Sequence, residues 1–411
     1  MRPTLFGMAL VVAGCTSGGV RTSASIASVD EPPDRVACEG GDGAACLRFG
    51  HAYETGQSVD ADDARALELY ARACELGEAR GCTALGTRYY AGTDVATNQA
   101  RAAELFTRGC DGGDIIGCYN LAVLLSRPLG GGEPNLTRAR ELFARACEGD
   151  ILAACNNLGL MNLNGIGGEL DAARAVELLS AGCAADDPRA CHNLGLALMR
   201  QGPERGAAAA TALEQGCRAH IGASCASLGE IYEDGIGVPA DRGRARTIYE
   251  EACTAGLPEP CVKLGVLYAE GRGVTADLAR ARELFEQGCD EESVAGCRAL
   301  GGLYEHGRGV DRDYAQARAL YTQACDGGEA EGCVALGSLH SNSRGVEQDH
   351  VRAGELFSRG CEAGSGRGCF NLAASYARGL GVEQDRERAR ALFARACGLG
   401  EQRACRVIDE H

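Results

Sequence analysis

The chain contains no tryptophan, and aromatic residues make up only 5% of its 411 residues. Because strands draw on β-branched and aromatic residues, this scarcity argues against a sheet sandwich and favours thin, closely packed helices. Basic residues are also outnumbered, since 41 lysines and arginines face 57 aspartates and glutamates, for a net charge of −16. An acidic chain repels phosphate backbones, so we expect no nucleic-acid partner.

Cysteine, in contrast, is abundant, with 23 copies. A reducing cytosol rarely tolerates so many cysteines unless they bind metal. The first of them, Cys15, stands apart from the rest and follows Arg2, an apolar run from Leu5 to Val12, and the small pair Ala13-Gly14. The apolar run is too short to span a bilayer as a helix.

This N-terminal pattern resembles a bacterial lipoprotein signal. The resemblance implies a signal peptide over residues 1–14, and lipidation of Cys15 as the new N-terminus after cleavage. Residues 15–35 are small, polar and aperiodic, which predicts a flexible Ser/Gly/Pro tether. Thr16, where aspartate would signal retention, implies sorting to an outer membrane. We therefore expect an exported, membrane-anchored protein on the periplasmic or surface face.

The other twenty-two cysteines form eleven pairs with a constant offset of 8, and the pairs recur every 36 residues apart from one step of 37 and one of 34. A fixed period of this size predicts a solenoid. The pairs are Cys38 and Cys46, Cys74 and Cys82, Cys110 and Cys118, Cys147 and Cys155, Cys183 and Cys191, Cys217 and Cys225, Cys253 and Cys261, Cys289 and Cys297, Cys325 and Cys333, Cys361 and Cys369, and Cys397 and Cys405.

The residues between the cysteines predict two helices per unit. In the unit from 261 to 289, Leu264-Gly265 and Tyr268 mark one face of a first helix, here named helix A. The turn 271–274 supplies glycines that end helix A, and Asp277 can cap the next helix. Residues 281–289 then repeat apolar side chains at helical spacing, which predicts a second helix, helix B. Each cysteine pair thus links the end of a helix B to the start of the next helix A.

Structural zinc sites usually combine two close cysteines with a second such pair. Here each junction between a helix B and the next helix A, named a corner below, has one widely spaced cysteine pair and no matching histidine. The spacing therefore favours disulfides, with about 2–3 kcal/mol expected from closing each short loop. Sequence alone does not determine which cysteines pair. The uniform offset makes bonding within each pair the simplest arrangement.

Three phrases, at 73–82, 264–274 and 317–325, resemble Sel-one-like repeats, relatives of the tetratricopeptide repeat. The cysteine version is similar to the Helicobacter cysteine-rich protein family. The likeness covers residues 36–408 and implies an all-α fold, a right-handed superhelical solenoid of antiparallel αα hairpins with one disulfide each. It implies ten complete units with truncated terminal helices. The units at 118–147, 191–217 and 333–361 depart from the pattern.

That family has been credited with penicillin binding and weak β-lactamase activity, which the resemblance makes possible here. A serine β-lactamase needs Ser-x-x-Lys and a Lys-Thr-Gly-like element. The only lysine, Lys263, has Pro260 three residues before it and Leu264-Gly265 after it, which excludes Ser-x-x-Lys and Lys-Thr-Gly. No two of the seven histidines lie within five positions, so no His-Glu-x-x-His zinc motif exists. We predict no catalytic residues, no metal site and no cofactor.

Asparagine lies two residues after the second cysteine in several units, as Asn120, Asn157, Asn193 and Asn371. In related helical-repeat proteins, asparagines on helix A bind the backbone of a peptide in the concave groove, a role that suits a side chain that both donates and accepts. The alternative is that they satisfy local groups near a helix start.

The predicted function is an interaction scaffold for an unknown extracytoplasmic protein or peptide, since solenoids build long binding surfaces. Two alternatives stay open: binding of β-lactams or peptidoglycan fragments with weak hydrolysis, and a purely structural spacer.

Overall fold

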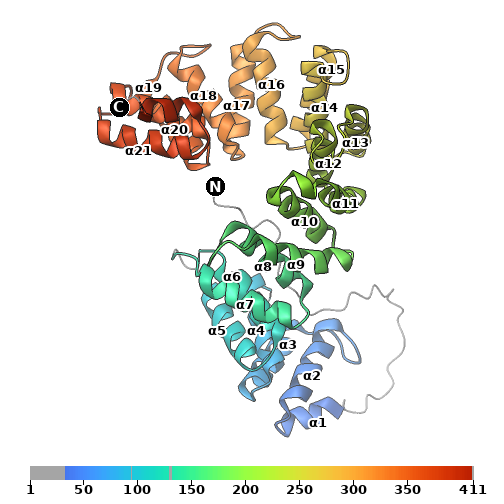
Figure 1. The fold of residues 1–411 in the computed structure, drawn as a ribbon. Helices are drawn as coiled ribbons and strands as arrows, with labels where there is room; N and C mark the ends of the chain where they lie inside the picture. The colour runs from blue at the N-terminus through green and yellow to red at the C-terminus, as the bar shows by residue number, and fades with distance from the viewer. Residues whose placement is uncertain (1–32, 94, 129–131, 410–411) are drawn as a thin grey trace. The chain divides into compact units, whose positions relative to one another are not determined.

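The computed structural model describes residues 33–93, 95–128 and 132–409. The predicted signal peptide, the lipidation site Cys15 and the tether up to residue 32 lie outside the described residues. Within the described ranges the chain forms twenty-two α-helices and one short 3₁₀ helix, η1 (Pro203–Arg205), and no strand (Figure 1). No helix in these ranges is long and apolar enough to cross a membrane.

The helices alternate between the two predicted kinds, and the expected all-α solenoid of helical hairpins is confirmed. The A helices are α2 (Gly43–Thr55), α4 (Ala79–Ala91), α6 (Ile115–Leu125), α8 (Leu152–Asn164), α10 (Pro188–Gln201), α12 (Gly222–Asp234), α14 (Pro258–Glu270), α16 (Val294–His306), α18 (Ala330–Ser341), α20 (Gly366–Arg378) and α22 (Gln402–Asp409). The B helices are α1 (Pro33–Glu39), α3 (Asp63–Glu75), α5 (Gln99–Asp111), α7 (Leu136–Glu148), α9 (Ala172–Ala184), α11 (Gly206–Arg218), α13 (Arg242–Thr254), α15 (Leu278–Asp290), α17 (Tyr314–Asp326), α19 (His350–Glu362) and α21 (Arg386–Gly398).

The helix ends follow from the turn residues. Helix α14 ends at Gly271, whose φ of 68° and ψ of 31° are left-handed angles that glycine adopts without strain. Helix α15 begins after Asp277, whose carboxylate accepts a hydrogen bond from the backbone N–H of Arg280 at 2.9 Å. This cap satisfies one of the amides left without a partner in the first turn. The predicted glycine turn and aspartate cap are both confirmed.

The glycine of the Leu-Gly pair lets a ring from the following helix B lie against the backbone of helix A. A Cβ added at Gly86 would lie 2.8 Å from the Phe106 ring, and one at Gly265 would lie 2.6 Å from the Phe285 ring. Phe106 and Phe285 are 0% and 3% exposed. The core is therefore a series of local clusters of aromatic and leucine side chains between neighbouring hairpins, as expected of a repeat array.

Disulfides join the two cysteines of all eleven pairs, with Cα–Cα separations between 4.4 and 4.8 Å, inside the range that an S–S bond spans. The bonds are Cys38 with Cys46, Cys74 with Cys82, Cys110 with Cys118, Cys147 with Cys155, Cys183 with Cys191, Cys217 with Cys225, Cys253 with Cys261, Cys289 with Cys297, Cys325 with Cys333, Cys361 with Cys369, and Cys397 with Cys405. Bonding between different corners, which the sequence left open, does not occur.

In each corner the first cysteine belongs to a helix B, and the second lies in the first turn of the next helix A. The disulfides therefore fix the turn between each helix B and the next helix A. All the second cysteines are buried except the last, Cys405, which is half-buried in the terminal helix α22. The buried ones are Cys46, Cys82, Cys118, Cys155, Cys191, Cys225, Cys261, Cys297, Cys333 and Cys369.

A second link across the corners was not predicted. The residue two positions before the first cysteine of a helix B, here named the corner position, reaches back to the preceding corner. Arg108 donates to the carbonyl oxygen of Cys74 at 2.8 Å, and Arg145 donates to that of Cys110 at 2.9 Å. The other such bonds run from Gln287 to Cys253 (3.4 Å), from Arg359 to Cys325 (3.1 Å) and from Arg395 to Cys361 (3.0 Å). Each of these carbonyls already accepts a backbone N–H from the following turn, as Cys74 does from Gly77 at 3.1 Å, so the side chain of the corner position supplies a second donor to the end of the helix.

The described chain divides into two compact units, residues 33–197 and 198–409, each considered by itself below. The unit at 191–217, which lacks the usual glycine turn, contains η1 in its place. The unit at 333–361 ends helix α18 at Ser341, one residue early, and Ser343 takes a positive φ of 55°. A non-glycine residue adopts that angle only at some energetic cost.

Candidate functional site

The A helices form a continuous face over α2, α4 and α6 in the first unit, and over α12, α14, α16, α18 and α20 in the second. Helix α4 contacts both α2 and α6, and in the second unit contacts run in the same way from α12 through α14, α16 and α18 to α20. Successive B helices in these stretches do not contact one another to the same extent. Hairpins stacked in this way curve with helix A on the inner side, which is the side that solenoids use to bind partners.

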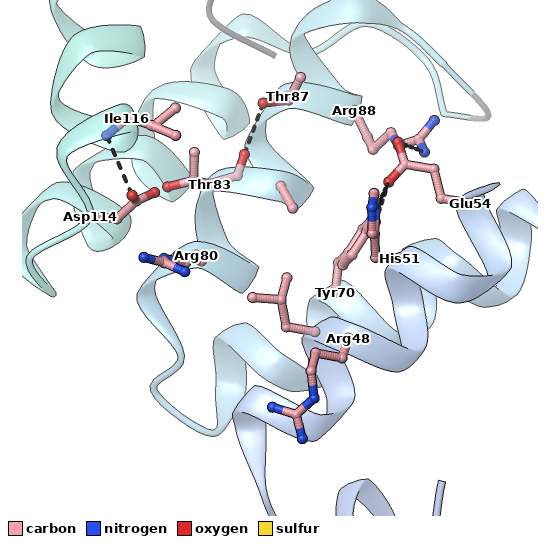
Figure 2. Close-up of a pocket in the computed structure, with 12 residues that line it drawn as sticks. Arg48, His51, Glu54, Tyr70, Arg80, Thr83, Thr87, Arg88, Asp114 and Ile116 are labelled. Atoms are coloured by element: carbon pink, nitrogen blue, oxygen red, sulfur yellow. Dashed lines mark hydrogen bonds and ion pairs between the residues drawn. The ribbon is translucent and has the colours of Figure 1, made fainter. Parts of the chain in front are cut away.

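In the first unit this face contains a cavity of about 280 Å³, shown in Figure 2. Leu47 from α2, Ala84 from α4 and Ile116 from α6 supply apolar surface to it. Arg48 and Arg80 lie at its rim, on α2 and α4. An apolar hollow of this size beside charged groups suits one bulky side chain of a ligand.

Glu54 on α2 organises one wall of the cavity. It accepts a hydrogen bond from the Tyr70 hydroxyl of α3, and its Oε1 lies 2.6 Å from Arg88 Nη2 of α4. His51 Nδ1 lies 3.3 Å from the other carboxylate oxygen (Figure 2). Burial, with the hydrogen bond to the Glu54 carboxylate as the second cause, raises the pKa of Tyr70 far above its ordinary value. The wall is thus a fixed network of side chains from three helices.

The hydroxyl groups in the cavity are turned to the backbone. Thr87 donates to the carbonyl oxygen of Thr83 at 3.0 Å, and Thr83 donates to that of Ala79 at 3.4 Å. At the rim, Arg48 pairs with Asp34 at 2.7 Å. Arg80 is exposed and forms no ion pair with any residue that the structure describes. A ligand carboxylate or other anion therefore finds one available guanidinium beside an apolar floor.

In the second unit, a groove of about 630 Å³ runs along the same kind of face, over α14, α16, α18 and the start of α20. Its wall repeats the Glu54 arrangement: the Tyr321 hydroxyl donates to Glu305 at 2.7 Å, and Arg344 pairs with Glu305 at 2.9 Å. Here too, burial is the main cause that raises the pKa of the tyrosine. The arginines of this groove are largely matched by acids, as in the pair Arg367–Glu331 at 3.0 Å.

Sequence reasoning missed these walls, although the signal was present. Three B helices carry a tyrosine at the position where Phe106 and Phe285 lie against the glycine of helix A. These tyrosines are Tyr70, Tyr249 and Tyr321. In each case a glutamate lies sixteen residues earlier on helix A, as Glu54, Glu233 and Glu305. An arginine of the next repeat then pairs with the glutamate, for example Arg272 with Glu233 at 2.8 Å.

The four asparagines predicted to line a groove lie in two settings. Asn120 and Asn157 are 0% and 3% exposed. Asn193 and Asn371 are half-buried, and Asn193 donates to Asn156 Oδ1 at 2.8 Å. None of the four lines the cavity of Figure 2 or the groove over α14–α20. Their role in peptide binding stays a prediction.

Among the residues that the structure describes, no cluster of three or more histidine, cysteine, aspartate or glutamate side chains could hold a metal ion. The disulfide cysteines line neither the cavity of Figure 2 nor the groove over α14–α20. The two hollows differ in character: the first unit has an apolar cavity with an arginine rim, and the second unit has a polar groove.

Comparison with solved structures finds repeat proteins of the same build. A protective antigen of uropathogenic Escherichia coli that displays an SLR fold has a TM-score of 0.55 and 23% identity, with 92% of this chain and 81% of that chain covered. This likeness shows the fold alone. A Sel1 repeat protein from Oxalobacter formigenes matches with a TM-score of 0.45 and 23% identity, over 53% of this chain and 86% of that one. Cysteine-rich protein B of Helicobacter pylori matches with a TM-score of 0.28 and 25% identity, over 32% and 95%.

No curated protein matches the chain by sequence. The Sel1 repeat model matches nine times, at residues 43–78, 79–114, 115–150, 152–187, 222–257, 261–293, 294–329, 330–365 and 366–401. Residues 188–221, which include the shortened unit, are the gap between two matches. Since the nine matches cover well over half of the sequence, the chain belongs to the Sel1 repeat family.

Proposed function

We propose that the protein is a lipid-anchored extracytoplasmic scaffold that binds a protein or peptide through its A-helix face, with the Figure 2 cavity as the anchor site. The Sel1 repeat is typical of protein–protein interaction. One observation supports the position of the site: the apolar floor formed by Leu47, Ala84 and Ile116 lies directly beside the exposed guanidinium of Arg80. The ligand segment would insert one apolar side chain and pair an acidic group with Arg80.

The predicted magnitude follows from the size of the anchor. Full burial of one leucine or phenylalanine side chain contributes about 1.5–3 kcal/mol, which corresponds to about a 10- to 100-fold change in Kd. The walls around Glu54 would hold the cavity open, because its three partners come from α2, α3 and α4. A preformed site loses little free energy to rearrangement on binding.

Eleven disulfides indicate an oxidising, extracytoplasmic environment. We propose that Cys15 anchors the chain to the outer membrane there, on the support of the apolar run and small residues that precede it. Intact mass of the exported protein tests this, because acylation adds a large defined mass while each disulfide removes two hydrogens. A mature chain that retains residues 1–14, or a Cys15 without lipid, contradicts the anchor.

The binding site is tested with Ala84→Arg, which fills the floor of the cavity, and with a matched control, Ala100→Arg, on the exposed side of α5. A photo-crosslinker at the rim position 48, which keeps Arg80 in place, identifies the bound segment in a cell-envelope fraction, and a synthetic peptide of that segment gives the Kd. We expect Ala84→Arg to weaken binding about 10-fold or more while Ala100→Arg leaves it unchanged. Equal binding by both variants, with helicity preserved, would refute the site.

A further inference from the structure

The side chain at the corner position does more than donate to the carbonyl of the preceding corner, because it also covers the disulfide there. Arg145 Nη1 lies 3.5 Å from Cys110 Sγ as well as donating to the Cys110 carbonyl. First cysteines whose carbonyl receives such a bond are almost fully buried. They are Cys74 (2% exposed), Cys110 (1%), Cys253 (4%), Cys325 (1%) and Cys361 (1%). The corner positions that follow Cys183 and Cys289 are also glutamines, Gln215 and Gln323, and both of these cysteines are buried.

Three corners lack a side chain that can donate this bond, and one of them is Cys397–Cys405, which no further helix B follows in the described chain. The corner position after Cys147 is Ala181, which is too short, and the one after Cys217 is Glu251. A carboxylate cannot donate to the Cys217 carbonyl, because both groups are acceptors. Glu251 is accordingly exposed, and Cys147 and Cys217 are both half-buried.

The Cys217–Cys225 corner also opens onto free space. A cavity of about 280 Å³ is lined by both cysteines, by Glu251 and by the apolar side chains of Leu228 and Ile248. Arg218 pairs with Glu214 at 2.9 Å, which leaves the Glu251 carboxylate as the remaining negative charge on the lining. A small thiol reagent can therefore reach Cys217, while Cys225 behind it is 1% exposed.

We propose that Cys217–Cys225 is a thiol–disulfide exchange site that accepts a dithiol reductant. A thiolate of the reagent attacks Cys217 Sγ, the S–S bond breaks, and Cys225 leaves as a thiolate that takes up a proton. The second thiol of the reagent then attacks the mixed disulfide and releases Cys217 as a thiol. The dithiol is oxidised to a cyclic disulfide as the protein disulfide is reduced, so two electrons and two protons are transferred. This site is separate from the A-helix face and does not depend on its ligand.

The reaction would free the corner between α11 and α12 and leave closed the corners whose carbonyl receives a donor from the next helix B. Exchange rates depend on access to the attacked sulfur as well as on the thiols involved. The corner position sets that access, so exchange can be moved from one corner to another by substitution.

The test is a timed exposure of the full, folded chain to dithiothreitol, followed by acid quench, alkylation of free thiols and peptide mass spectrometry. We expect Cys217 and Cys225 to be labelled about tenfold faster than Cys325 and Cys333. Glu251→Gln, which copies the donor at position 287, and Glu251→Arg should slow labelling to the rate of the covered corners. Glu251→Ala, which removes the charge without supplying a donor, should leave the corner fast.

Arg359→Ala supplies the reverse test, because it uncovers Cys325 and should raise the labelling rate of Cys325–Cys333 about tenfold. Circular dichroism before reduction shows whether each variant keeps its helices. Equal rates at all eleven corners would overturn the proposal. So would equal acceleration by Glu251→Gln and Glu251→Ala, since this would show that charge, and not cover, controls the rate.

Discussion

Gly301 and Gly302 are neighbours in the middle of helix α16, yet alanine at the two positions should act with opposite sign. A Cβ at Gly301 would lie 2.8 Å from a carbon of the Tyr321 ring, whereas a Cβ at Gly302 would meet nothing nearer than the Tyr321 hydroxyl at 3.8 Å. Tyr321 has little freedom to move, because it is 3% exposed and its hydroxyl is bound to Glu305. The first substitution must therefore distort the packing, and the second fits existing space.

The magnitudes separate cleanly because both glycines lie inside one helix. Each replacement by alanine gains about 0.8–1 kcal/mol of helix propensity. Overpacking costs about 1–3 kcal/mol, so Gly301→Ala should lose up to about 2 kcal/mol in total. Gly302→Ala should keep the gain. The difference between the two variants isolates the steric cost, since the propensity gain cancels.

Guanidinium unfolding with the disulfides intact measures both variants, compared at equal m value. Hydrogen exchange of the α16 amides then locates the change. In a Tyr321→Leu background the penalty of Gly301→Ala should shrink, which a double-mutant cycle detects. If Gly301→Ala stabilises the protein as much as Gly302→Ala does, the ring does not rest on the helix backbone as described.

Two further predictions concern buried polar groups. Burial raises the pKa of the Glu233 carboxyl in the folded state. Wild type should therefore lose stability relative to Glu233→Gln as pH rises from the unfolded-state pKa of about 4.3 through the folded pKa. Urea midpoints across this pH range measure the difference in stability, and a difference that stays constant contradicts the prediction. Asn120→Ala should destabilise the chain by about 1–3 kcal/mol because Asn120 is fully buried, whereas Asn371→Ala, at a half-buried position, should cost less. Thermal melts compare the two variants, and a larger loss of stability for Asn371→Ala contradicts the prediction.

Much of the fold could be predicted because one chemical pattern recurs eleven times. The cysteine offset marked every corner, the glycine at 271 marked a helix end, and Asp277 marked the next start. Each of these residues acts through its immediate neighbours, so the sequence carries the information locally. The Leu-Gly pair also predicted close packing of helix B against helix A, since glycine in a helix interior costs stability and is expected where close packing requires it.

The candidate site was less predictable because it depends on contacts between repeats. Asn120 and Asn371 occupy the same position in their units, yet one is buried and the other half-buried. The corner position was overlooked for the same reason: Arg108 acts on Cys74, in the preceding unit. A side chain that spans two units is visible in sequence only when the units are aligned and compared position by position.

Such a comparison separates two kinds of position in this chain. Most corners and turns keep the same residue types along the array, because most hairpins use the same disulfide, cap and helix end; the units at 191–217 and 333–361 are exceptions. The position two residues after the second cysteine changes from Arg48 to Ala84 to Asn120 over three units. The disulfides fix each corner whatever the exposed side chains of the A helices are, so exposed positions such as Arg48 are free to differ from unit to unit, whereas the buried Asn120 is part of the core. Binding specificity can therefore be placed there without loss of the fold.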